Sequence, residues 1–234
     1  MSPNRDVWCN PPVGASFVRR SGFFPDREVL TMIDFTRFRN PEFHRGAPRW
    51  KEVLWWIVRS LLFAPWFPLP SSLKVAALRA FGAKVGRKVV IRSRVNITFP
   101  WRLEIGDHVW IGDDVFILSL DRVKIGSHVC ISQGVFFCTG SHDHRKDTFD
   151  LITAPIIVLD RSWIAARAFI GPGVTAGPDA VIGAGALVVK DVPEGMAAYG
   201  NPARIRPARP IEEIFAPQPA PHPAFTNSAA RGKN

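Results

Sequence analysis

Apolar residues recur at every sixth position in this chain between about residues 85 and 193. The longest unbroken series is Val158, Ile164, Ile170, Ala176, Ile182 and Val188, and shorter series start at Val85, Ile105 and Ile125. A period of six matches neither the 3.6-residue turn of an α-helix nor the two-residue alternation of a flat strand. It is typical of a hexapeptide β-helix, a repeat architecture that is recognised by its fixed period.

Each hexapeptide in such a β-helix is a short strand with a turn, and three of them form a triangular coil of about 18 residues. The apolar residue and the residue four places later then point inward; the later one is small or β-branched, as in Val109, Val115 and Ala180. Glycine often follows the apolar residue, where its backbone freedom suits a turn. The sequence therefore predicts an all-β chain with a parallel β-helix of about five coils over residues 83–206. A β-sandwich with regular turns is the weaker alternative.

The six-residue phase is interrupted three times. Ile97 and Ile105 are eight residues apart instead of six, and so are Ile117 and Ile125. The third interruption is the longest, and it contains a polar, charged and aperiodic segment over residues 138–150. Insertions in a stacked repeat become loops on one face, which is often the binding face. We therefore expect the chemistry of this protein in the third interruption.

Three features together resemble the hexapeptide-repeat O-acetyltransferases. They are the repeat, the segment Cys138-Thr139-Gly140-Ser141-His142-Asp143, and the ending Gly200-Asn201-Pro202-Ala203-Arg204. Residues 78–86 and the tripeptide Phe99-Pro100-Trp101 are similar to the branch of that family named for colanic acid biosynthesis. The resemblance covers roughly residues 50–207. It implies left-handed coils, although parallel crossovers are right-handed in nearly all other folds. It also implies acetyl-CoA as cosubstrate and a sugar hydroxyl, in exopolysaccharide biosynthesis, as acceptor.

Direct transfer of an acetyl group from a thioester to a hydroxyl needs a base for the hydroxyl proton and donors for the oxyanion. Histidine is the natural base near neutral pH. His142 lies in the polar insertion and matches the catalytic histidine of the resembled family, so we predict that it is the general base. Asp143 and backbone carbonyls near the loop are predicted to orient the imidazole, with Asp143 also a candidate substrate contact. His144, in the same loop, is predicted to be exposed or to face the substrate. Related sugar acetyltransferases place an Asn of the preceding coil beside this histidine, and Ser119, the corresponding residue here, is predicted to bind substrate through its hydroxyl.

The resemblance places the pantetheine arm of coenzyme A along the seam between two subunits. The implied cofactor contacts are Trp163, Ala166, Ala184, Lys190, Arg204 and Arg206, of which the last three would meet the phosphates and the adenine. A triangular prism cannot bring the base and all these residues onto one face of one chain, so we expect a homotrimer with closed three-fold packing. No metal is expected.

The segments on either side of the repeat differ from it in composition. Residues 1–49 are expected to form a poorly ordered arm and residues 207–234 a disordered tail rich in Pro and Ala. The sequence of residues 50–82 predicts helices that cap the open end of the solenoid. Residues 50–67 combine several aromatic side chains with Lys51 and Arg59, and this combination is also typical of a helix in a membrane interface. The helical run is too short to span a bilayer.

The formal net charge is +10. The basic residues are spread along the chain without a nucleic-acid-binding motif, so we predict no nucleic-acid partner. A groove for cofactor phosphates or attraction to an anionic membrane surface explains the charge better.

Three cysteines form no even disulfide framework, and residues 1–6 lack the apolar stretch of a signal peptide. Both observations favour a cytoplasmic protein. Such a protein could also bind peripherally to the inner face of the membrane.

Two other functions are left open. A zinc-dependent γ-type carbonic anhydrase shares the expected fold, and His108, His142 and Asp147 have roughly the spacing of its three ligands. The sequence around His142 and the ending at residues 200–204 disfavour this alternative. A non-enzymatic scaffold, anchored to a membrane by the aromatic helix, would explain residues 50–67 but would have no use for the histidine loop.

Overall fold

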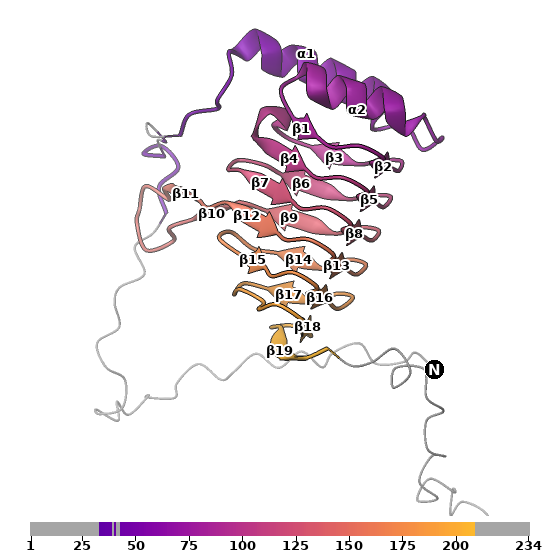
Figure 1. Ribbon diagram of the computed structural model, residues 1–234. Helices are drawn as coiled ribbons and strands as arrows, with labels where there is room; N and C mark the ends of the chain where they lie inside the picture. Colours follow the sequence, from indigo (N-terminus) through magenta and orange to yellow (C-terminus); the bar gives the residue numbers. More distant parts are fainter. Residues whose placement is uncertain (1–32, 39, 41–42, 209–234) are drawn as a thin grey trace, which may run out of the picture.

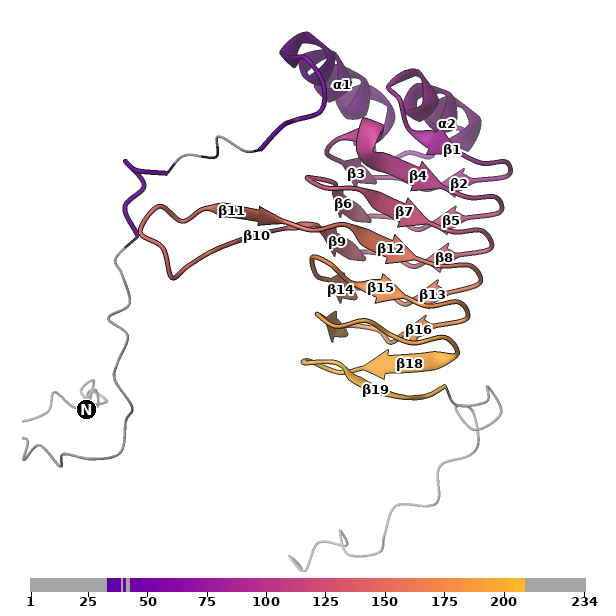
Figure 2. The ribbon, with the colours of Figure 1, turned by 60° about the vertical axis from the view of Figure 1, so that its left-hand side comes forward.

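The computed structural model describes residues 33–38, 40 and 43–208 (Figure 1). Two helices cover one end of a triangular β-solenoid, a long hairpin projects from its side, and a second hairpin closes the other end (Figures 1 and 2). Most of the predicted arm and most of the predicted tail lie outside the described residues.

Three sheets of parallel strands form the sides of the solenoid. Sheet 1 contains β1 (Lys84–Val85), β4 (Leu103–Ile105), β7 (Val123–Ile125), β12 (Ile156–Val158) and β15 (Thr175–Ala176). Sheet 2 contains β2 (Val90–Ile91), β5 (Trp110–Ile111), β8 (Cys130–Ile131), β13 (Trp163–Ile164), β16 (Val181–Ile182), β18 (Met196–Tyr199) and the antiparallel β19 (Arg204–Pro207). Sheet 3 contains β3 (Asn96–Ile97), β6 (Phe116–Leu118), β9 (Phe136–Cys138), β14 (Phe169–Ile170) and β17 (Leu187–Val188).

The predicted parallel β-helix is confirmed. Five coils are complete, and a sixth, partial coil consists of a bridge between Ala176 and Val192 followed by β18. In Figure 2 the strands of sheet 1 run from left to right across the front, and the chain then returns behind them through sheets 2 and 3 while it descends. This rotation is left-handed, as the resemblance implied and against the usual hand of parallel crossovers.

The interior consists of the residues that the six-residue period predicts. Ile105, Ile125 and Val158 are register partners in sheet 1, so each lies directly above the next, and they are 5%, 1% and 0% exposed. The residues four positions after the apolar ones are equally buried: Val109, Val115, Val129, Val135, Val174, Ala180 and Ala186 are at most 1% exposed. Stacking like residues on like residues builds one continuous core along the axis.

The glycines that follow the apolar residues serve a purpose that the sequence analysis did not predict. Gly106, Gly112 and Gly126 have no left-handed φ; that conformation occurs two residues later at His108, Asp114 and His128. A Cβ on Gly106 would lie 2.6 Å from the Ser127 hydroxyl and 2.7 Å from the backbone of the next coil. Glycine is therefore required for the close approach of neighbouring coils rather than for its own turn angles.

The helices α1 (Arg49–Leu62) and α2 (Ser71–Ala80) cap the first coil, as predicted. Trp55 is fully buried on the inner face of α1, and its indole Nε1 donates a hydrogen bond of 2.9 Å to the carbonyl of Ile97. Lys74 on α2 is 1% exposed and donates to the carbonyls of Ile91 and Arg92. These bonds satisfy backbone acceptors at the open end of the solenoid. Neither helix is long and apolar enough to cross a membrane, and the other described residues contain no such helix.

All three interruptions of the period lie at the edge where the chain passes from sheet 3 to sheet 1, which we call the insertion edge. A short 3₁₀-helix (Pro100–Arg102) precedes β4, residues 119–122 precede β7, and the hairpin of β10 (Gly140–His142) and β11 (Leu151–Thr153) precedes β12. Because consecutive coils stack, these three segments lie one above another. The fold therefore gathers the irregular residues of three coils on one edge of the prism.

Candidate active site

The hairpin of β10 and β11 projects from the insertion edge (Figure 2). Its strands are antiparallel, with His142 opposite Leu151 and Gly140 opposite Thr153. At the tip, the amide of Asp143 donates to the carbonyl of Asp150 at 2.9 Å. A two-stranded hairpin without further support is marginally stable in water, so its packing against other segments determines its shape.

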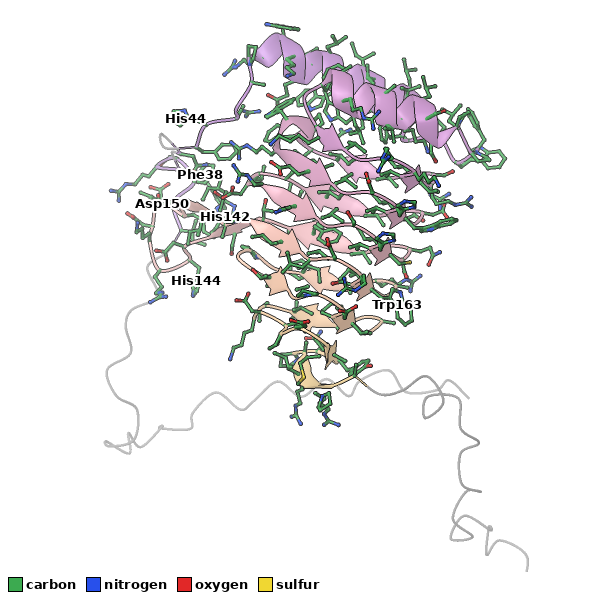
Figure 3. All side chains as sticks on the ribbon, in the orientation of Figure 1. Phe38, His44, His142, His144, Asp150 and Trp163 are labelled. Atoms are coloured by element: carbon green, nitrogen blue, oxygen red, sulfur yellow. The ribbon has the colours of Figure 1, made fainter. Side chains whose placement is uncertain are left out.

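His142 lies on this hairpin, on the same side of the solenoid as Phe38 (Figure 3), and packs against two aromatic rings. Its imidazole is stacked on Phe149, with ring centroids 4.2 Å apart, and the ring of Phe38 lies at 5.8 Å. Its Nδ1 is 2.9 Å from the carbonyl oxygen of Phe149. Because a carbonyl only accepts hydrogen bonds, this contact requires the proton of a neutral imidazole to be on Nδ1. The lone pair of Nε2 is then left to accept a proton.

The described part of the N-terminal arm packs along the hairpin. The amide of Asp34 donates to the carbonyl of Asp147 at 2.9 Å, and Arg37 forms an ion pair with the Asp147 side chain. Asn40 accepts a hydrogen bond of 3.0 Å from the amide of Leu151. Sequence reasoning did not assign Asp34, Arg37 or Asn40 of the arm to the site. The aromatic residues of the arm were a weak signal, since Phe35 and Phe38 both contact hairpin rings.

The three predicted substrate residues have different surroundings. Ser119 is fully buried, where its hydroxyl accepts from the amide and donates to the carbonyl of Phe99, so the fold does not direct it toward a ligand. Asp143 accepts from the amide of Arg145. Of the two kinds of orienting group that the sequence suggested, a backbone carbonyl, that of Phe149, contacts the ring of His142. His144 is exposed at the hairpin tip (Figure 3).

A cavity of about 440 Å³ lies at the insertion edge beside the hairpin. It is lined by Phe43, His44, Arg102, Asp121, Leu151 and Thr153. Each of the three interruptions contributes to this lining, and the arm supplies the rest. Nη2 of Arg102 donates to the carbonyl of His44, and the guanidinium lies over the rings of Phe43 and Phe99 at 5.4 and 5.8 Å. Burial lowers the pKa of Arg102, and the charge of Asp121 opposes that shift.

Most of the predicted cofactor residues gather around sheet 2. Trp163 on β13 is 47% exposed, and its indole Nε1 donates to the hydroxyl of Ser132 at 3.0 Å. Ala166 and Ala184 follow β13 and β16, and the amide of Gly185 donates to the carbonyl of Ala166, so their turns are stacked.

The three predicted phosphate-binding cations are all exposed. Arg204 and Arg206 belong to β19, which pairs with β18 at the end of sheet 2. Lys190 follows β17 of sheet 3, where the chain leaves toward sheet 1, so the fold does not group it with Trp163.

Within one chain, His142 and Trp163 lie on opposite sides of the solenoid (Figure 3). The hairpin leaves the edge between sheets 3 and 1, whereas β13 belongs to sheet 2. The predicted base and the predicted cofactor seam are therefore on different faces of the prism.

The possible metal ligands are also dispersed. In residues 33–38, 40 and 43–208, no three or more His, Cys, Asp or Glu side chains form a group that could hold a metal ion. His108 stacks on His128 with centroids 4.8 Å apart, and Asp147 pairs with Arg37.

No protein-family model matches the chain. Over 173 residues it is 43% identical to the Escherichia coli (strain K12) protein named "Putative colanic acid biosynthesis acetyltransferase WcaF", covering 74% of this chain and 94% of that protein. The hexapeptide-repeat acetyltransferase VCA0836 of Vibrio cholerae, solved in complex with acetyl-CoA, superposes with a TM-score of 0.57 and 32% identity, over 61% of this chain and 80% of that one. A galactoside acetyltransferase in complex with coenzyme A shares the fold, with a TM-score of 0.64 and 22% identity over 73% and 86% of the two chains. Identity of this extent with WcaF, on a solenoid of the same construction as VCA0836, shows that the chain belongs to the hexapeptide-repeat acetyltransferases.

Proposed function

We propose that this acetyltransferase moves the acetyl group of acetyl-CoA to a sugar hydroxyl in exopolysaccharide biosynthesis, with His142 as the general base. The identity with WcaF supports the pathway, and the acetyl-CoA complex of VCA0836 supports the cosubstrate. The observation that carries the mechanism is the contact between Nδ1 of His142 and the carbonyl of Phe149.

In the proposed reaction, Nε2 of His142 removes the proton of the acceptor hydroxyl while that oxygen attacks the thioester carbonyl. A C–O bond forms and gives a tetrahedral oxyanion. When the intermediate collapses, the C–S bond breaks and the imidazolium returns its proton to the coenzyme A thiolate. The Phe149 carbonyl keeps the reactive nitrogen fixed and stabilises the imidazolium, because it accepts the Nδ1 proton throughout.

The complete site is proposed to form between two subunits of a homotrimer. The separation of His142 from Trp163 supports this arrangement, since closed three-fold packing would bring the hairpin of one copy against sheet 2 of the next. Trp163, Ala166 and Ala184 would then line the pantetheine channel, and Arg204 and Arg206 would bind phosphate. Lys190 is proposed to contribute less to phosphate binding, because the fold does not group it with Trp163.

The protein is further proposed to work in the cytoplasm at the inner face of the membrane. Trp50, Val53, Leu54, Trp56, Ile57 and Leu61 on α1 are 45–69% exposed, and Trp66 is 78% exposed. A cap needs only the inner face that carries Trp55, so this second apolar face is available to enter a lipid interface. It lies at the end of the solenoid, and a trimer with parallel axes would present three such faces in one plane.

The proposed function is tested by comparing the exopolysaccharide of a strain with and without the gene. Mass spectrometry should detect an acetyl ester that is absent from the deletion strain and restored by the wild-type gene. An unchanged acetylation pattern, or a purified protein that binds stoichiometric zinc and transfers no acetyl group, would overturn the proposal.

A further inference from the structure

The cavity at the insertion edge contains a half-buried cation, Arg102, that forms no ion pair with any of the residues that the structure describes. Arg102 has no carboxylate oxygen within 4 Å in the described part of the chain, whereas eight ion pairs are formed elsewhere in it. Asp121 lines the same cavity without forming an ion pair with Arg102. Removing a charge from water costs free energy unless a partner compensates for it.

The guanidinium is held in a fixed orientation. It lies over the rings of Phe43 and Phe99, and one of its nitrogens donates to the carbonyl of His44. These contacts come from the arm and from the ring of Phe99, so the plane of the guanidinium is set before any ligand arrives. A planar, pre-oriented guanidinium is suited to bidentate hydrogen bonding with a carboxylate or a phosphate.

We propose that this cavity binds an anionic group of the acceptor, a carboxylate or a phosphate, through Arg102. The inference rests on the proposed function and names the chemical class of its acceptor. A volume of about 440 Å³ lies in the range of small-molecule sites and accommodates a sugar with its charged group. Asp121 and Thr153 provide polar atoms for neutral hydroxyls, and Asp121 also weakens the attraction of any anion.

The cavity adjoins the predicted base. Leu151 lines the cavity and is the cross-strand partner of His142 in the hairpin. A ligand anchored on Arg102 therefore lies against the hairpin that carries the base. The proposed contact fixes one end of the acceptor and leaves its hydroxyl groups to reach His142.

Binding to the full-length protein, measured by NMR or calorimetry without acetyl-CoA, tests the inference. The probes are glucuronate, glucose 1-phosphate, inorganic phosphate and neutral glucose, each at millimolar concentration. We expect glucuronate or glucose 1-phosphate to bind at least about tenfold more tightly than glucose, as a charge-assisted pair would give. The tighter of the two identifies the anion as a carboxylate or a phosphate. Inorganic phosphate shows whether the anion is recognised without the sugar.

Three variants connect that binding to the cavity. Arg102→Gln should weaken anion binding by about tenfold, and Asp121→Asn should strengthen it by about threefold, since a nearby negative charge is removed without a change in shape. A gain of affinity cannot result from unfolding, so Asp121→Asn remains decisive if Arg102→Gln folds poorly. Arg161→Gln removes an equal charge from an exposed ion pair with Asp179 in another coil and should leave binding unchanged.

Equal affinity for glucose and for both sugar anions, or no binding of any anion, would overturn the inference. So would an Asp121→Asn protein that gains no affinity. His142→Ala should bind the anion as the wild type does. A protein that binds sugar anions but never transfers acetyl groups would refute the proposed function and leave the anion site standing.

Discussion

The carbonyl oxygen of Phe149 lies 2.9 Å from Nδ1 of His142, and the ring of the same phenylalanine is stacked on the imidazole with centroids 4.2 Å apart. Phe149 adopts a left-handed backbone with φ 49°, which is uncommon for a residue other than glycine. In this conformation both its carbonyl and its ring meet one histidine. The same conformation occurs at turns of the repeat such as His108 and Asp114, so it is the two contacts with His142 that distinguish Phe149.

Replacing the proposed base should abolish most of the turnover. We expect His142→Ala to lose at least about 100-fold in kcat, the lower end for acid–base catalysis, with little change in coenzyme A affinity. Release of free thiol from acetyl-CoA measures the rate. His128→Ala, at a turn on another edge, is the matched control and should stay active. A folded His142→Ala protein with near-normal turnover would refute the role.

The stack on Phe149 should contribute a smaller factor. Phe149→Ala keeps the carbonyl but removes the ring, and an aromatic pair contributes about 0.5–1.5 kcal/mol, so kcat should fall by about 2- to 12-fold. Phe149→Tyr retains a ring and should recover most of the rate. KM for acetyl-CoA should be unchanged in both variants. If kcat fell in Phe149→Ala and stayed equally low in Phe149→Tyr, the loss would argue for a general structural defect.

Mixed trimers test the shared site. His142→Ala and Trp163→Ala, each nearly inactive alone, should recover activity when they are unfolded together and refolded. Random assembly into rings gives one site in four with both wild-type residues, so we expect about a quarter of the wild-type activity. Light scattering on the same sample measures the oligomer. An active monomer, or no recovery in well-formed trimers, would contradict the shared site.

The outer face of α1 should bind anionic vesicles. The double variant Ile57→Glu and Leu61→Glu places two negative charges on exposed positions and should prevent co-sedimentation with anionic vesicles at low salt. Val189→Glu, 55% exposed at the far end of the solenoid, is the control and should sediment as the wild type does. High salt should weaken wild-type binding. Wild-type protein that stays in the supernatant at low salt would show that this face has another partner.

Two glycines of the repeat should differ in their tolerance of a methyl group. A Cβ on Gly106 would be 2.6 Å from Ser127 and 2.7 Å from the backbone of Gly126, whereas a Cβ on Gly171 meets nothing closer than 3.3 Å. Gly106→Ala should therefore lower the free energy of unfolding by about 1–3 kcal/mol, the range for overpacking. Gly171→Ala should lower it less. Urea unfolding measures both, and equal losses would contradict the close-approach explanation.

The sequence by itself determined the coils and the residues inside them. A repeat of six apolar positions is local information, because every coil meets its neighbours through the same few positions. The same regularity made the departures visible, so the segment with His142 could be predicted as the place for chemistry before its geometry was known. The motif predicts His142 as the base but does not predict the orientation of its imidazole.

Only the tertiary structure decided what surrounds His142. Asn40 and Leu151 are 111 residues apart in the chain, and no periodicity links an irregular arm to an irregular hairpin. The inward direction of Ser119 also became clear only when the hydroxyl was found between the amide and the carbonyl of Phe99. A period specifies which side chains stack within the repeat. The contacts of aperiodic segments depend on individual shapes and polar groups that meet once the solenoid has brought three insertions to the same edge.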